Sequence, residues 1–227
     1  MPLRRSAVVR LIMAAALIAF ASAGAPAQST ATQPAQHRTT STPYTGDLSI
    51  FDTPGREQKL HIDQVMDILG IEPGKSVADI GAGSGWFTVL AAKRVATTGT
   101  VYAVDINPEA VDYINGRIQK EQLHDVKTIH STPENPELPP ASVDAVLFLK
   151  AYHEVANPVV LLRNLRVSLR PGARVGIIER NGNSENHGVD KNVVLHEAGE
   201  AGYRLLEEHD DLVKGDRMDY FLVLAAR

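Results

Sequence analysis

Short apolar runs that alternate with helical stretches are the feature that most constrains how this chain can fold. Strands separated by helices are βαβ units, so the pattern predicts a mostly parallel sheet with helices on both faces. The predicted strands are Ser76–Ile80, Thr100–Asp105, Val126–His130, Ala145–Phe148, Ala173–Glu179, Tyr203–His209 and Met218–Ala225. The predicted helices among them are Trp86–Arg94, Pro108–Glu121, Pro158–Leu169 and Asp190–Ala201.

The segment before the first predicted strand and the last two predicted strands complete the prediction of the fold class. Before the first strand, apolar residues recur at helical spacing from Leu60 to Leu69, and Gly70 ends that helix. Only the polar turn 210–217 separates the last two strands, which should therefore form an antiparallel hairpin at the edge of the sheet. The predicted fold class is α/β: a Rossmann-like, doubly wound sheet of seven strands, mostly parallel, with an antiparallel C-terminal hairpin strand.

The first 27 residues are organised like a secretory signal peptide. Arg4, Arg5 and Arg10 precede the apolar run 11–23, and residues 25–27 supply alanines at the spacing of a cleavage site. The run is shorter than the roughly 20 residues that cross a bilayer as a helix, so a cleaved signal is favoured over a permanent anchor. We therefore expect an exported, periplasmic protein without a stable membrane anchor.

Residues 28–46 are predicted to be a flexible linker. Thirteen of these 19 residues are Ser, Thr, Gln or Pro, and none is a large aliphatic residue. Such a segment cannot bury enough apolar surface to offset the entropy lost on ordering it. The predicted folded domain is therefore 47–227.

Net charge and residue content limit the classes of partner that this chain is expected to bind. A net charge of −4 offers no attraction to nucleic acid, so a small molecule is the expected partner. The absence of cysteine excludes thiolate metal sites and cysteine nucleophiles. His196-Glu197 is followed by Glu200 where a metalloprotease motif requires histidine, and we expect no metal. The oligomeric state stays open.

A glycine-rich loop, Gly81-Ala82-Gly83-Ser84-Gly85, follows the first predicted strand, where open α/β sheets bind ligands. Alternate glycines let the backbone turn sharply and approach a ligand that any Cβ would exclude. Trp86 stands where the dinucleotide fingerprint requires glycine or alanine, and the lysine of a phosphate-binding P-loop is absent. The alternative is a loop that only connects strand to helix.

Asp105 ends the second predicted strand, 24 residues after Gly81. A carboxylate at this position can accept hydrogen bonds from both hydroxyls of a ribose, and Ile106 can pack on a purine. Capping of the helix that follows Asn107 is the alternative role for Asp105. The glycine loop at the expected distance favours ribose binding.

The segments Val77–Thr88 and Val101–Pro108 resemble the cofactor motifs of class I S-adenosylmethionine-dependent methyltransferases, and the resemblance extends over 51–224. It implies S-adenosylmethionine as the cofactor and methyl transfer to a small-molecule acceptor that it does not identify. An adenine-contacting loop is implied after the third strand. The implied cofactor-binding residues are Asp79, Gly81, Ala82, Gly83, Gly85, Asp105, Ile106, Glu134 and Asn135.

A narrower resemblance, carried by residues 51–56, 152–154 and 200–203, is to exported bacterial predicted methyltransferases. In this family an N-terminal segment often covers the cofactor, which would place Phe51, Asp52 and Arg56 over it. A surface helix start with a solvated Arg56 is the alternative.

The candidate catalytic residues are Tyr152, His153 and His187. Methyl transfer needs a base only when the acceptor must lose a proton, and His153 titrates near neutral pH at the tip of the fourth strand. Tyr152 is a candidate wall of the cofactor pocket, and His187 in a polar loop is a second candidate base. His153 as a pocket-shaping residue and His187 on a flexible surface loop are the alternatives.

Two other functions remain open. One is an exported module that binds adenosylmethionine or a related nucleoside without turnover, because adenosylmethionine is made in the cytoplasm. The other is a nucleotide-dependent oxidoreductase, against which Trp86 argues.

Overall fold

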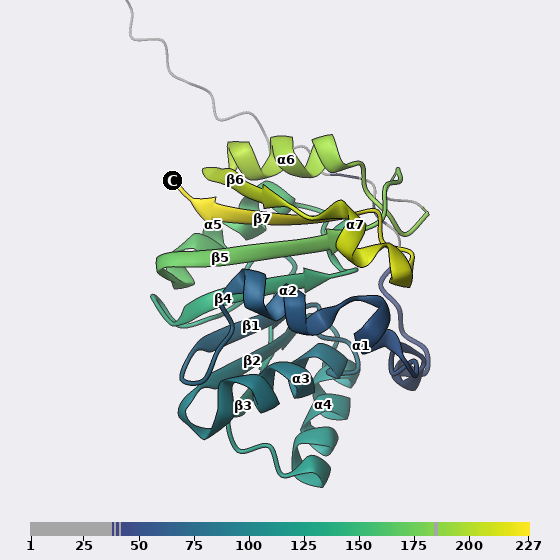
Figure 1. Ribbon diagram of the computed structural model, residues 1–227, viewed down its shortest axis with the longest axis vertical. Coiled ribbons are helices and arrows are strands. Elements are labelled where there is room, and N and C mark those ends of the chain that lie inside the picture. The colour runs from purple at the N-terminus through teal and green to yellow at the C-terminus, as the bar shows by residue number, and fades with distance from the viewer. Residues whose placement is uncertain (1–37, 39, 41, 184–185) are drawn as a thin grey trace, which may run out of the picture. The chain divides into compact units, whose positions relative to one another are not determined.

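A computed structural model describes residues 38, 40, 42–183 and 186–227, and the predicted signal peptide lies outside them. They contain a seven-stranded sheet in the order β3-β2-β1-β4-β5-β7-β6 (Figure 1). The strands are β1 (Ser76–Ile80), β2 (Thr100–Asp105), β3 (Val126–His130), β4 (Val143–Leu149), β5 (Leu169–Glu179), β6 (Tyr203–Glu208) and β7 (Tyr220–Ala226). The α-helices are α1 (Arg56–Lys59), α2 (Ile62–Leu69), α3 (Trp86–Val95), α4 (Pro108–Glu121), α5 (Pro158–Ser168), α6 (Lys191–Glu200) and α7 (Asp210–Val213). The 3-10 helices are η1 (Leu48–Phe51), η2 (Ala96–Thr98), η3 (Tyr152–Glu154) and η4 (Lys214–Asp216).

The strand pairing confirms the predicted fold class. β1 pairs in parallel with both β2 and β4, so the strand order reverses around β1. The antiparallel strand is β7, which pairs with β5 on one side and with β6 on the other. β7 therefore lies inside the sheet and β6 lies at its edge, so the predicted antiparallel hairpin at the edge of the sheet is confirmed and β6 is its outer strand. The reason is burial: residues 220–224 are all buried, whereas β6 is exposed along much of its length and suits an edge.

Helices cover both faces of the sheet (Figure 1). α2 and α3 contribute to the apolar core on one face, and α5 and α6 contribute to a second core on the other. Because side chains alternate along a strand, Val77 of β1 belongs to the first core and Ala78 to the second. All five residues of β1 are buried, as expected for the central strand of a doubly wound sheet.

Local signals set the helix boundaries near the reversal point. The Asn107 side chain accepts a hydrogen bond from the Glu109 N–H at 2.9 Å, and Pro108 follows as the first helical residue of α4. α2 ends at Gly70, whose φ of +70° lies in the left-handed region that favours glycine. Because β1 pairs in parallel with β2 and β4, the loops after these three strands lie at one end of the sheet.

The packed part of the chain begins before residue 47, inside the segment predicted to be a linker. The Arg38 guanidinium donates hydrogen bonds to both carboxylate oxygens of Glu197, at 3.0 and 3.2 Å. It also donates to the carbonyl oxygens of Tyr152 and Val155, at 2.6 and 2.9 Å. Composition did not predict this contact, because an arginine rather than buried aliphatic residues makes it.

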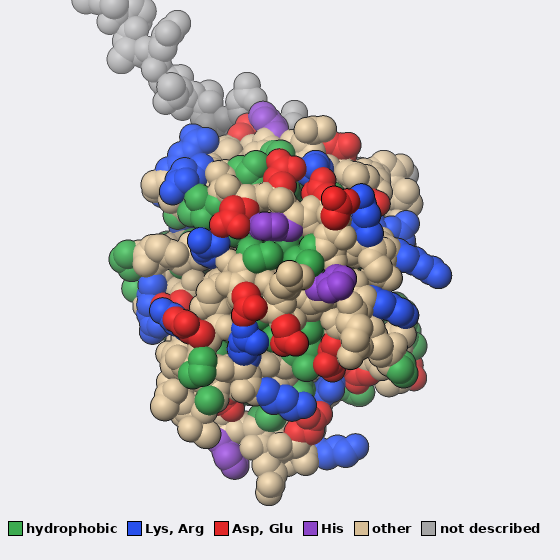
Figure 2. Space-filling model, in the orientation of Figure 1, with side chains coloured by type: hydrophobic (Ala, Val, Ile, Leu, Met, Phe, Trp, Pro, Cys, Tyr) green, Lys and Arg blue, Asp and Glu red, His purple; other side chains and the backbone are tan. Residues whose placement is uncertain are grey.

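The surface is of mixed charge. Lysine and arginine side chains alternate with aspartate and glutamate over the face seen in Figure 2. Within the part of the chain that the structure describes, no helix has the length and apolarity needed to cross a membrane.

Leu165→Ala is expected to lower the free energy of unfolding by about 2–5 kcal/mol, because Leu165 of α5 is fully buried. Val167 lies on the same helix with 63% of its surface exposed, so Val167→Ala should change stability by less than about 0.5 kcal/mol. Urea unfolding of both variants measures the difference. Equal effects would contradict the assignment of this face of α5 to the core.

Candidate functional site

A cavity of about 330 Å³ lies where the strand order reverses, at the carboxyl ends of β1, β2 and β4. Its wall includes the loop after β1, the end of β2, the segment 131–136 after β3 and the turn that follows β4. Open α/β sheets bind their ligands at this position. The cavity is therefore the candidate site.

The glycine loop forms the floor of the cavity. Gly81, Gly83 and Gly85 have φ values of +73°, +55° and +72°, which other residues rarely adopt. A Cβ at Gly81 would lie 2.5 Å from the Cβ of Ala151, in the turn after β4. The Gly81 and Ala82 N–H groups donate to the Val104 carbonyl oxygen at 2.8 and 3.1 Å, so the loop is held against β2.

Asp105 joins this loop to β2. Its Oδ2 accepts a hydrogen bond from the Gly83 N–H at 2.9 Å, and its Oδ1 accepts one from the Asn107 N–H at 2.9 Å. Each carboxylate oxygen has further acceptor capacity, and Asp105 lines the cavity together with the partly exposed Ile106. The side chain that caps α4 is that of Asn107, which leaves Asp105 available for a ligand.

Asp79 lies at the end of β1 with only 2% of its surface exposed, and it also lines the cavity. The Thr88 hydroxyl donates a hydrogen bond to its Oδ2 at 2.7 Å. Burial, with a smaller contribution from the negative charge of Asp105, raises the pKa of Asp79 to about 7 against the lowering effect of the Thr88 hydrogen bond. A cationic group of a ligand would favour the ionised form of this carboxyl.

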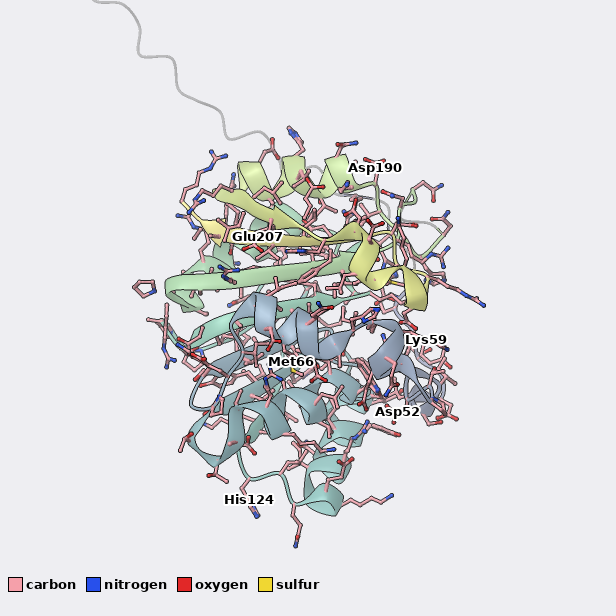
Figure 3. The ribbon with its side chains drawn as sticks, in the orientation of Figure 1. Asp52, Lys59, Met66, His124, Asp190 and Glu207 are labelled. Atoms are coloured by element: carbon pink, nitrogen blue, oxygen red, sulfur yellow. The ribbon has the colours of Figure 1, made fainter. Side chains whose placement is uncertain are left out.

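The segment before α1 lies against the glycine loop, and Phe51 of this segment and Arg56 at the start of α1 line the cavity. Asp52 accepts hydrogen bonds from the Ser84 hydroxyl at 2.9 Å and from Arg117 Nη1 at 3.0 Å. Figure 3 shows Asp52 at the same end of the sheet as Lys59 of α1. Tyr44, Leu48 and Phe51 line the cavity, so this segment forms one of its walls.

Arg56 is buried in that wall rather than solvated. Its guanidinium carbon lies 4.4 Å from the centroid of the Trp86 ring, and its Nε donates to Asp216 at 3.3 Å. Trp86 thus packs against an arginine at the cavity. The sequence had indicated only that Trp86 does not fit the dinucleotide fingerprint.

The loop after β3 reaches the cavity through residues other than the predicted ones. Its lining residues include Ser131, Thr132 and Pro133, and neither Glu134 nor Asn135 is among them. Glu134 Oε1 accepts a hydrogen bond from Asn157 at 2.6 Å, and Asn135 donates to Glu137 at 2.9 Å. The sequence predicted the loop but not the side chains that face the cavity. Pro133 and Pro136, which both line the cavity, mark this stretch in the sequence.

The Tyr152 side chain points away from the cavity. It is fully buried, and its hydroxyl donates to Glu197 Oε2 at 2.9 Å. Burial raises the pKa of Tyr152 well above its ordinary value, and the negative charge of Glu197 adds to this effect. Among the residues that line the cavity, Tyr152 is absent.

His153, also a candidate base, is buried behind the cavity wall, and its Nδ1 lies 2.8 Å from Glu179 Oε1. The exposed His187 lies beside it, with the two ring centroids 5.7 Å apart. Neither histidine lines the cavity, whereas Glu154 does. Burial raises the pKa of Glu154 to about 7, against the opposing charge of His153. Its place directly after His153 was the sequence signal for it.

Comparison with known proteins agrees with this geometry. Residues 78–177 match a family model described as a methyltransferase domain. A demethylmenaquinone methyltransferase from Geobacillus sp. (strain WCH70) is 24% identical over 117 residues, which cover 52% of this chain and 50% of that protein. The chain thus spans about half the length of the curated relatives it matches.

Two solved structures share the fold. A SAM-dependent methyltransferase from Aquifex aeolicus has a TM-score of 0.71 at 23% identity, covering 79% of this chain and 98% of that chain. Fibrillarin from Aeropyrum pernix, in complex with natively bound S-adenosyl-L-methionine, has a TM-score of 0.54 at 14% identity and covers 68% of each chain.

Asp79→Asn is expected to flatten the pH dependence of stability between about pH 4 and pH 7. The pKa of Asp79 rises from its ordinary value of 3.8 to about 7, so in this range the folded state holds a proton that the unfolded state has released. The wild-type chain should therefore lose stability as pH rises. Asparagine keeps an acceptor for the Thr88 hydroxyl but does not titrate. Urea unfolding at several pH values measures this, and identical slopes for the two chains would contradict it.

Proposed function

We propose that this chain, which belongs to the class I S-adenosylmethionine-dependent methyltransferases, binds S-adenosylmethionine in the cavity and transfers its methyl group to a small-molecule acceptor. The observation that carries the proposal is the convergence of the glycine loop, Asp79 and Asp105 at the point where the strand order reverses. The glycine loop can lie against the methionine part of this cofactor, Asp105 can accept hydrogen bonds from its ribose, and the buried Asp79 can face its cationic group.

Each of these groups has a distinct task in binding. Asp105 would accept hydrogen bonds from the ribose hydroxyls with its free acceptor capacity, and Ile106 would pack on the purine. The bare backbone at Gly81 and Gly83 lets the methionine part lie close to the loop. Asp79 would favour the cationic end of that part, and Arg56 would face its carboxylate.

The bound cofactor supplies an electrophilic methyl group on a positively charged sulfur. Displacement at that methyl disperses the charge, so the protein has to orient the two reactants and exclude water. The apolar side chains of Leu48, Phe51 and Phe148 on the cavity wall suit the exclusion of water. Tyr152 and His153 do not line the cavity and therefore take no part in proton transfer there.

Size and charge support a small acceptor. A volume of about 330 Å³ is within the range of small-molecule sites, and the net charge of −4 with mixed surface charge (Figure 2) does not favour nucleic acid. The signal-like pattern of residues 1–27 supports export to the periplasm as part of the same proposal.

Asp105→Ala is expected to weaken S-adenosylmethionine binding by about 1–3 kcal/mol, because the ribose hydroxyls lose their acceptor. Asp112→Ala is the matched control, since Asp112 is an exposed aspartate on α4, the helix that follows Asp105. Calorimetric titration of the full chain and both variants measures the affinities. Unchanged affinity in Asp105→Ala would remove this residue from the site.

The thermal stability of the chain in the presence of each ligand tests which ligand it binds. At about 100 times its dissociation constant, S-adenosylmethionine should add roughly 2.7 kcal/mol to the free energy of unfolding, whereas NAD should add nothing. A shift with NAD alone would favour the oxidoreductase. If S-adenosylmethionine binds but no small molecule gains a labelled methyl group, a binding module without turnover would be favoured.

A further inference from the structure

His153, Glu154 and His187 form a cluster beside the cavity that the proposed cofactor site does not use. One ligand atom from each side chain lies within 4.8 Å of the others. The Nε2 of His153 is 3.8 Å from Glu154 Oε1, and the two imidazole rings are nearly perpendicular. The cluster joins η3, which follows β4, to the loop between β5 and α6.

The orientation of His153 is fixed from behind. Its Nδ1 lies 2.8 Å from Oε1 of Glu179, a carboxylate with no exposed surface. The same carboxylate accepts the backbone N–H groups of His153 and Arg180, both at 3.2 Å. An acceptor at Nδ1 holds the proton there, so Nε2 presents a lone pair to the cluster. Histidines that bind metal have this arrangement of a carboxylate behind the ring.

The lone pair of His153 Nε2 therefore faces the carboxylate of Glu154, and both groups are acceptors. Among the hydrogen bonds of residues 42–183 and 186–227, none ends on an oxygen of the Glu154 side chain. A cation between the two acceptors would satisfy both groups.

The third side chain is brought to the cluster by its backbone. The Val189 N–H donates to the Arg180 carbonyl oxygen at 2.8 Å, which turns the loop back toward β5. Gly188 allows this approach, because a Cβ there would lie 2.8 Å from the same oxygen. His187 has a φ of +59°, which is uncommon for a residue other than glycine. The loop thus brings His187 next to His153 and holds the His187 backbone in an unfavourable conformation.

We propose that His153, Glu154 and His187 bind one divalent transition-metal ion of the Zn²⁺ class. Two imidazoles and one carboxylate are ligands that such ions prefer, whereas Ca²⁺ and Mg²⁺ prefer oxygen alone. With metal–ligand bonds of about 2.0–2.2 Å, ligand atoms on one ion lie about 3–3.5 Å apart. His153 and Glu154 are near that separation at 3.8 Å, and the exposed His187 has room to move inward.

Three protein ligands leave at least one coordination position open, as in catalytic rather than structural zinc sites. Glu154 is part of the cavity wall, so the open position would be reached from the cavity. This last step rests on the proposed function: the group that takes the open position would belong to the methyl acceptor. The acceptor would then be a small molecule with an oxygen or nitrogen that coordinates a metal.

The full chain is first stripped of metal with a chelator. Its binding of Co²⁺ and Zn²⁺ then tests the site. One equivalent of Co²⁺ should produce a visible absorption band that one equivalent of Zn²⁺ removes. His187→Ala and Glu154→Gln should each weaken Zn²⁺ binding at least tenfold in calorimetric titration. His196→Ala is the control, because His196 forms an exposed histidine–glutamate pair with Glu200 at 3.6 Å and should leave the affinity unchanged.

Absence of the Co²⁺ band in the wild-type chain, or equal Zn²⁺ affinity in His187→Ala, would overturn the metal site. An equal loss in His196→Ala would also overturn it, because surface histidines would then account for the binding. S-adenosylmethionine affinity is measured on the same samples. Zn²⁺ binding without S-adenosylmethionine binding would contradict the proposed function alone, and the reverse result would contradict the metal site alone.

Discussion

The contact between Gly81 and Ala151 is the constraint on which the rest of the site depends. Because Gly81 has no side chain, the loop after β1 and the turn after β4 can meet where a Cβ would approach Ala151 to 2.5 Å. The first of these segments forms the floor of the cavity, and the second leads directly into His153 and Glu154. One close approach of the Gly81 backbone to the Ala151 side chain therefore sets the spacing between the proposed cofactor site and the proposed metal site.

Carboxylates organise this end of the sheet more than any other residue type. Asp105 accepts backbone N–H groups from both the glycine loop and the start of α4, and Glu179 holds His153 in one orientation. Asp52 accepts hydrogen bonds from Ser84 and Arg117, which attaches the N-terminal segment to the same loop. Of these acids, Asp105 lines the cavity, so a ligand there meets a carboxylate that the protein has already positioned.

The sequence predicted the fold because buried parallel strands leave unbroken apolar runs, and the bounds of β1, β2 and β3 coincide with those runs. It placed the glycine loop and Asp105 at the cavity because chain order brings them to the reversal point. The hairpin at the edge of the sheet was predicted, but not that β6 is its outer strand, since a hairpin pattern does not show which strand is buried on both faces. The meeting of His187 with His153 and Glu154 was missed because His187 is more than 30 residues from both and reaches them only through the pairing of β4 with β5.

The N-terminal segment that forms one wall of the cavity is attached at two places. Arg38 holds one end to Glu197 and to the turn after β4, and Asp52 holds the other end to α4. Movement of this wall requires a partly buried ion pair to open, and such pairs are screened by salt less than exposed ones. The two anchors therefore bear more on the rate at which a bound molecule exchanges with solvent than on how tightly it is held. For the proposed methyltransferase, the residence time of a spent ligand would then depend on Arg38 and Asp52, neither of which lines the cavity.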